Sequence, residues 1–248
     1  MNLLTYVMHL VGSGAFAYYS AAQIRDSKTR PNILAGFQLA ESGSVPFLTA
    51  LSERAAAEGD TWLAQKLKQH ASDETRHGQI FAHGLKQLNK QVIDWKSQPQ
   101  TTSTDKSKQQ RSPFFAAFFE GYTPEQLKPA VIDWNVFMGS TYILELDASK
   151  DFPRMAKALP DDEPIARNLK LGILNVAKDE TTHAAYLYEA MTKRMSLTQV
   201  QELIDEWRTR KVNATFAFAS NLLQGKSPNR SLVQDSMPSQ KDSQLIGT

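Results

Sequence analysis

The sequence contains no cysteine among its 248 residues. This absence excludes disulfides, zinc–thiolate sites, iron–sulfur clusters and thiolate-bound iron centres. An excess of either charge is also lacking, because 28 basic side chains are mixed along the chain with 26 acidic ones. No basic face of the kind that binds a phosphate backbone is expected, and nucleic acid is not a predicted partner. Any redox chemistry must therefore use oxygen and nitrogen ligands.

The segment 1–24 has no charged side chain, but Asn2, His9 and Gly12 are among the residues that interrupt its apolar character. The segment lacks the basic start and compact apolar centre of a signal peptide. A membrane-spanning helix would need roughly 20 mostly apolar residues. We expect a buried or interface helix here, with a peripheral membrane contact as the alternative, and a cytoplasmic protein.

No stretch shows the sustained alternation typical of strands, whereas helical periodicity runs from Pro31 to Leu223, which predicts an all-α fold. Proline and glycine stops, a capping box at Thr123–Gln126 and a cap at Ser196 set the expected boundaries. The predicted helices are 31–59, 60–88, 123–151, 164–195 and 197–223. We expect one helical domain over residues 1–225, with its core at 31–195.

Two segments have too few apolar residues to pack. Residues 97–113 contain none, so we predict a long, exposed crossover connection between the second and third of these helices. The polar residues 226–248 predict a disordered tail.

Each of the four helices predicted within residues 31–195 carries one glutamate on its apolar face, and the second and fourth add a histidine three residues later. These candidate metal ligands are Glu41, Glu74, His77, Glu145, Glu180 and His183.

The two halves of this pattern form an approximate internal repeat. Ala71–His77 matches Ala177–His183 with an offset of 106 residues (177 − 71), and Glu41 matches Glu145 with an offset of 104 (145 − 41). Two antiparallel helical hairpins placed face to face would bring four carboxylates and two imidazoles to the same height.

Four carboxylates inside an apolar interior repel one another and lose hydration worth several kcal/mol each. Two divalent cations would balance their charge and leave open coordination positions. Zinc prefers fewer ligands, and magnesium or calcium seldom recruits histidine. We therefore expect two iron ions, with manganese or a mixed manganese–iron pair as the alternative.

On these residues the chain resembles the ferritin-like di-iron carboxylate superfamily, whose pattern is Glu, Glu-x-x-His, Glu, Glu-x-x-His. Asp73–His77 is most similar to rubrerythrins and aldehyde-deformylating oxygenases. The resemblance implies an antiparallel four-helix bundle with a long crossover between helices two and three and additional terminal helices. It also implies glutamates that bridge two irons, and activation of oxygen or peroxide.

The sequence departs from rubrerythrins in two ways. It has no cysteine-bound iron, and Tyr142 stands one turn before Glu145 where they need an additional glutamate. Peroxidase activity of the rubrerythrin type is therefore less expected, and reductive turnover would require an external electron donor.

Several other residues lie near the predicted ligands. Tyr142 and Tyr186 are each one turn from a ligand and are candidates for donating protons or electrons, with plain packing as the alternative. His70 is expected to be a hydrogen-bonded core histidine rather than an extra ligand. Asp73 and Asp179 are predicted either to orient the histidines or to form surface ion pairs.

The leading functional hypothesis is an oxygen-activating di-iron oxidase or oxygenase that acts on a small, largely apolar organic substrate. The first alternative is a ferroxidase, iron store or peroxide-reducing protein; a large shell would favour storage, whereas a monomer or homodimer with two irons would favour an enzyme. The second alternative is a metal-free scaffold that binds a partner through the aromatic patch Phe114–Phe119.

Overall fold

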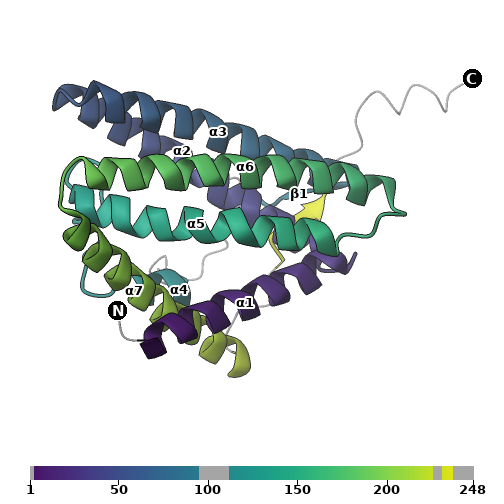
Figure 1. The fold of residues 1–248 in the computed structure, drawn as a ribbon. Helices are drawn as coiled ribbons and strands as arrows, with labels where there is room; N and C mark the ends of the chain where they lie inside the picture. Colours follow the sequence, from purple (N-terminus) through teal and green to yellow (C-terminus); the bar gives the residue numbers. More distant parts are fainter. Residues whose placement is uncertain (1–2, 95–111, 226–230, 237–248) are drawn as a thin grey trace, which may run out of the picture.

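The chain is described by a computed structural model over residues 3–94, 112–225 and 231–236 (Figure 1). These residues form seven helices and two short strands, which confirms the predicted mostly helical fold. The predicted crossover at 97–113 falls almost wholly outside the described residues, as does most of the predicted tail at 226–248.

Helices α2 (Arg30–Ala57) and α3 (Thr61–Gln87) form the first hairpin, close to the predicted bounds. Gly59 has a positive φ of 84°, a conformation that favours glycine, and turns the chain between them. The side chain of Asp60 then accepts a 2.8 Å hydrogen bond from the backbone N–H of Leu63 and caps α3. The two helices pack along their length (Figure 1).

Helices α5 (Trp134–Ala158) and α6 (Pro164–Thr192) form the second hairpin, and α3 packs against α6 (Figure 1). Four long helices thus lie in two antiparallel pairs.

The predicted start of the third of these helices is wrong. Thr123 and Gln126 do make the reciprocal hydrogen bonds of a capping box, at 2.8 and 3.3 Å, but turns follow instead of a helix. Pro129 has no N–H to donate to the preceding turn and disfavours a helical Lys128, which explains the failure. Helix α5 begins only after Asp133, whose side chain accepts from the backbone N–H of Asn135. It also continues past the predicted end, with Pro153 inside it.

The terminal helices α1 (Leu3–Arg25) and α7 (Leu197–Leu223) pack against α5 and against each other. The bounds of α7 are as predicted, and Ser196 and Gln199 form its capping box. The short helix α4 (Pro113–Phe118) lies on α7, where Phe118 packs edge-on against the buried ring of Trp207. Among the described residues, no helix combines the length and apolar character that crossing a membrane requires.

A buried polar contact joins α1, α5 and α7 and was not predicted. The Asp147 carboxylate on α5 accepts hydrogen bonds from Ser13 of α1, at 3.1 Å, and from Lys211 of α7. The Nε2 atom of His9 lies 3.3 Å from the same carboxylate. Removing Asp147 would leave a largely buried lysine without its counter-charge, so this contact fixes how α1 and α7 sit on α5.

Two short strands accompany the helices and were not predicted. Strand β1 (Lys90–Val92) pairs antiparallel with β2 (Val233–Asp235), which lies within the predicted tail. The backbone N–H of Leu232 donates a 2.6 Å hydrogen bond to Asn32 on α2. Leu232 and Val233 pack against the apolar core, which is what holds this otherwise polar segment in place.

The apolar core consists of two clusters. The first, the Trp207 cluster, includes Leu67 of α3 and Leu187 of α6; the second, the Phe81 cluster, includes Phe81 of α3 and Ile173 of α6. Along each of the four long helices, the predicted metal ligands come between residues of the two clusters. The polar residues are therefore enclosed at both ends by hydrocarbon.

The close approach of α5 and α7 generates a stability prediction. A Cβ added at Gly139 would overlap the ring of Trp207, which is 1% exposed, so Gly139→Ala should lower the free energy of unfolding by about 1–3 kcal/mol. Gly14, a helical glycine of α1 with no neighbour near its Cβ position, is the control, and Gly14→Ala should stabilise by about 0.4–1 kcal/mol. Urea denaturation of both variants measures the difference, and equal stabilities would contradict the packing described.

Candidate metal centre

The six predicted metal ligands meet in the interior, one or two from each long helix. Five of them are buried residues, with exposed fractions of 9% for Glu41 and 0% for His77 at the extremes. The Glu145 side chain is 13% exposed. The repeat seen in the sequence therefore corresponds to a spatial cluster, and all six side chains contribute to it.

His77 faces three carboxylates. Its Nδ1 atom lies 3.4 Å from Glu41 Oε2, 3.7 Å from Glu74 Oε1 and 3.3 Å from Glu180 Oε1. One donor atom from each of these four residues lies within 4.8 Å of the others, which is close enough to hold one metal ion.

His183 occupies the equivalent place in the second hairpin. Its Nδ1 atom lies 3.3 Å from Glu180 Oε2, 3.6 Å from Glu145 Oε2 and 3.8 Å from Glu74 Oε1. The second group of donor atoms within 4.8 Å contains His183, Glu74, Glu145 and also His70. The two groups share Glu74.

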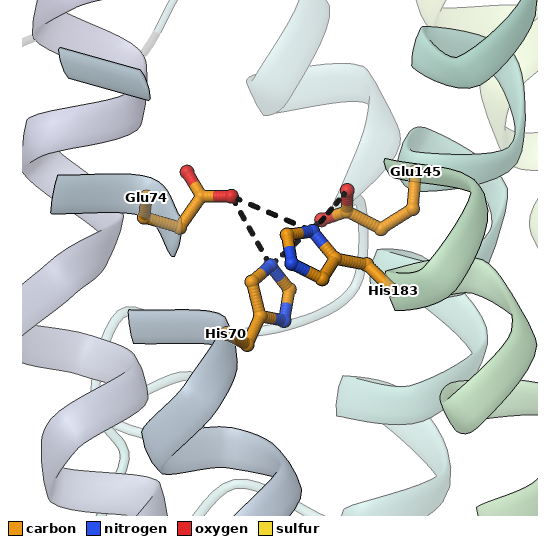
Figure 2. Close-up of side chains that lie close together, drawn as sticks. All are labelled: His70, Glu74, Glu145 and His183. Carbon is orange, nitrogen blue, oxygen red and sulfur yellow. Dashed lines mark hydrogen bonds and ion pairs between the residues drawn. The ribbon is translucent and has the colours of Figure 1, made fainter. Parts of the chain in front are cut away.

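His70 was predicted to be a core histidine, and it is buried and hydrogen-bonded as that prediction requires. Its Nδ1 atom and the hydroxyl of Tyr186 share a 2.8 Å hydrogen bond. Its Nε2 atom, however, points into the cluster, 3.2 Å from Glu74 and 3.4 Å from Glu145. Figure 2 shows its ring beside that of His183, between the two carboxylates.

Asp73 and Asp179 contact the histidines crosswise. The Nε2 atom of His77 lies 3.1 Å from Asp179 on the opposite hairpin, and that of His183 lies 3.4 Å from Asp73. Arg76 donates hydrogen bonds to both aspartates, at 2.7 and 2.9 Å. These carboxylates therefore fix which nitrogen of each histidine faces the cluster.

The two predicted tyrosines differ in position. Tyr186 is buried with its hydroxyl on His70, whereas Tyr142 is half-buried and lies against the ring of Tyr188, with centroids 6.0 Å apart. Of the two, Tyr186 is the one in hydrogen-bond contact with the cluster.

Sequence reasoning missed the roles of two further residues, one that contacts the cluster and one that contacts the aspartates beside it. The hydroxyl of Ser44 lies 3.1 Å from Glu74 Oε2, and Arg76 holds the two aspartates. Ser44 lies one turn after Glu41, and Arg76 directly precedes His77, so spacing alone could have singled both out.

The carboxylates respond in opposite directions to burial and to one another. Burial, reinforced by Glu74 and Glu180, raises the pKa of Glu41 well above its usual value. Burial and the neighbouring Glu145 raise the pKa of Glu180 to about 7. Burial also opposes ionisation of Glu74 and Glu145, but hydrogen bonds and charge from the surrounding side chains, His70 among them, outweigh it and lower the pKa of both. Two carboxylates thus favour ionisation and two resist it.

The histidines hold protons strongly in the absence of a metal. Burial disfavours the imidazolium, but the neighbouring carboxylates of Glu180, Glu41 and Glu74 outweigh it and raise the pKa of His77 to about 12. Glu145 and Glu180 likewise overcome burial and raise the pKa of His183 to about 10. Without a cation, protons on the imidazoles balance the buried negative charge.

The donor atoms fit a divalent transition metal. Nδ1 of His77 is buried and has no hydrogen-bond partner, although three carboxylate oxygens lie 3.3–3.7 Å away. A cation among these atoms would be coordinated by this nitrogen and the carboxylates together. Imidazole and carboxylate donors without thiolate suit iron or manganese.

Comparison with protein-family models, with curated proteins and with solved structures finds no match to this chain. The geometry of these residues therefore provides the evidence for function.

Metal binding should depend on pH in a defined direction. Because imidazole must be neutral to bind a metal and both histidines hold a proton up to about pH 10 or above, binding must release those protons. The apparent affinity for Co²⁺ should therefore rise from about pH 6 to about pH 8. Calorimetry in buffers of different ionisation enthalpy measures the protons released, and a pH-independent affinity would contradict the protonated cluster.

The crosswise aspartates generate a second binding prediction. Asp179→Asn removes the carboxylate that fixes His77, and should weaken Co²⁺ binding by about 10–100-fold. Lys178→Gln, at the exposed neighbouring position, is the matched control and should leave the affinity unchanged. If both variants bind Co²⁺ like the parent chain, Asp179 has no part in positioning His77.

Proposed function

We propose that this chain is a di-iron oxidase or oxygenase that activates dioxygen and acts on a small, largely apolar organic substrate. The observation that carries the proposal is the pair of buried donor groups that share Glu74, each with at least one histidine nitrogen facing several carboxylates. A buried cluster of this composition is hard to explain as a device for stability, because desolvating its charges costs several kcal/mol each.

We propose further that the fold is the ferritin-like four-helix bundle with a long crossover between its second and third helices. The support is the order of the elements: hairpin α2–α3, then residues 95–111 and α4, then hairpin α5–α6, with α3 against α6. In such bundles the metal ligands project inward from facing helices, and each hairpin here supplies three of them.

The contacts support a specific division of roles among the glutamates. Glu74 and Glu180 each approach Nδ1 of both His77 and His183, at 3.3–3.8 Å. Glu74 belongs to both donor groups and would help to hold both ions, whereas Glu180 belongs to the group of His77. Glu41 approaches His77 alone, and Glu145 approaches His183 on the other side, so each would bind one ion.

Iron bound by these residues would supply the redox chemistry with dioxygen. The protein contributes a dry and rigid environment for it. The Trp207 and Phe81 clusters enclose the site and exclude water, and Asp73 and Asp179 hold the histidine rings. The hydroxyl of Tyr186 shares a hydrogen bond with Nδ1 of His70 and so holds the proton between these two atoms. An external electron donor would complete a reductive cycle.

The apolar character of the substrate is supported by the residues nearest the site. Phe81 follows His77 by one helical turn and packs against Phe37, with ring centroids 5.2 Å apart, and Phe152 completes this group of rings. A neighbourhood of this kind favours hydrocarbon over a charged ligand.

Iron content and oxygen reactivity test the proposal. The chain loaded anaerobically with Fe²⁺ should bind two irons, one for each donor group, and should change its near-ultraviolet and visible absorption rapidly when oxygen is added. Glu74→Ala should lose both irons, because both groups use this residue. Glu53→Ala, at an exposed position of α2, should retain them.

Elemental analysis and stopped-flow absorption provide these readouts. Many irons per chain would identify a store instead, and two irons without an absorption change would exclude oxygen activation.

A further inference from the structure

The internal repeat breaks at two positions beside the metal centre. With the offset of 106 residues, His70 corresponds to Val176 (176 − 70), and Tyr186 corresponds to Ile80 (186 − 80). The polar pair and the apolar pair are thus related by the repeat but differ in chemistry. The break places a polar pair at one end of the site and an apolar pair at the other.

The structure places these pairs at opposite ends of the site. Val176 is fully buried within the Phe81 cluster, and Ile80 packs against that cluster. Tyr186 belongs instead to the Trp207 cluster, and its hydroxyl contacts His70. The two metal positions therefore have different surroundings, although their glutamates and histidines repeat.

His70 is placed as a ligand would be. It is 1% exposed, and the Tyr186 hydroxyl occupies its Nδ1 atom, so Nε2 is left for the cluster. That nitrogen approaches Glu74 and Glu145, and Nδ1 of His183 approaches the same two carboxylates (Figure 2). The two rings stack with centroids 3.7 Å apart.

We propose that His70 is a seventh metal ligand and makes the two metal positions chemically different. This inference rests on the proposed di-iron centre. One position offers His70, His183, Glu74 and Glu145; the other offers His77, Glu41, Glu74 and Glu180. The first has two imidazoles and the second has one.

This difference has a consequence for metal loading. Imidazole suits iron, whereas carboxylate and water suit manganese, so the position with two histidines binds Fe²⁺ first and more tightly. Tyr186 acts as a positioning residue, because its hydroxyl fixes the tautomer and the orientation of the His70 ring.

Anaerobic titration with isotopically enriched Fe²⁺, followed by Mössbauer spectroscopy, tests the assignment without measuring activity. The parent chain should give one quadrupole doublet at low iron and a second, distinct doublet as the other position fills. His70→Val, which copies the residue at the repeat-related position, should weaken binding of the first iron by at least about tenfold and change its doublet. His83→Val, an exposed histidine of the same helix, should change neither.

A second variant covers the case in which His70→Val does not fold, as judged by circular dichroism. Tyr186→Phe keeps the imidazole but removes its hydrogen-bond partner, and should shift the doublet of the first iron and weaken its binding by about 10-fold or more.

The outcomes separate this proposal from the one before it. If folded His70→Val binds two irons with parental affinities and parental doublets, His70 is a core histidine and the inference is overturned, while the di-iron centre stands. If the parent chain binds no iron, the di-iron centre itself is overturned.

Discussion

Four carboxylates enclosed between two apolar clusters set the main constraint on this molecule. Their burial is unfavourable unless positive charge and hydrogen-bond donors accompany them, and the protein supplies both from the histidines of α3 and α6. This requirement explains why each long helix contributes to the site and why the hairpins must stay in register. A shift of one helix by a single turn would remove its carboxylate from the cluster.

The same constraint extends beyond the residues that would touch a metal. Asp73 and Asp179 each bind a histidine of the opposite hairpin, so the polar contacts join the two hairpins across α3 and α6. Close packing accompanies them, because Gly172 of α6 lies where a Cβ would overlap Ile80 of α3. The repeat therefore produces an interface that is held by polar contacts at its centre and by small residues beside it.

Much of the fold was predictable because its signals are local. Gly59, Asp60 and Ser196 act within a few residues, and they gave the bounds of α2, α3 and α7 closely. Thr123 shows the limit of such signals, since its capping box forms without a helix once Pro129 intervenes.

The six clustered side chains were predictable from the repeat, whereas contacts between residues distant in sequence were not. The contact of His9 and Lys211 with Asp147 depends on how three helices pack, and the β1–β2 pair depends on a few apolar residues in a polar segment. Nor could periodicity show that Nε2 of His70 points into the cluster, because spacing places a residue on a face but does not set its rotamer.

Arg76 connects this buried centre to solvent. Its side chain is 46% exposed, yet it donates to the two aspartates that separately hold His77 and His183. A single guanidinium at the surface thus restrains both halves of the interior. Dissolved ions can screen the charge of this guanidinium, although they cannot reach the two buried histidines. The ionic strength of the solution acts on the two imidazoles jointly, through one side chain that touches neither of them.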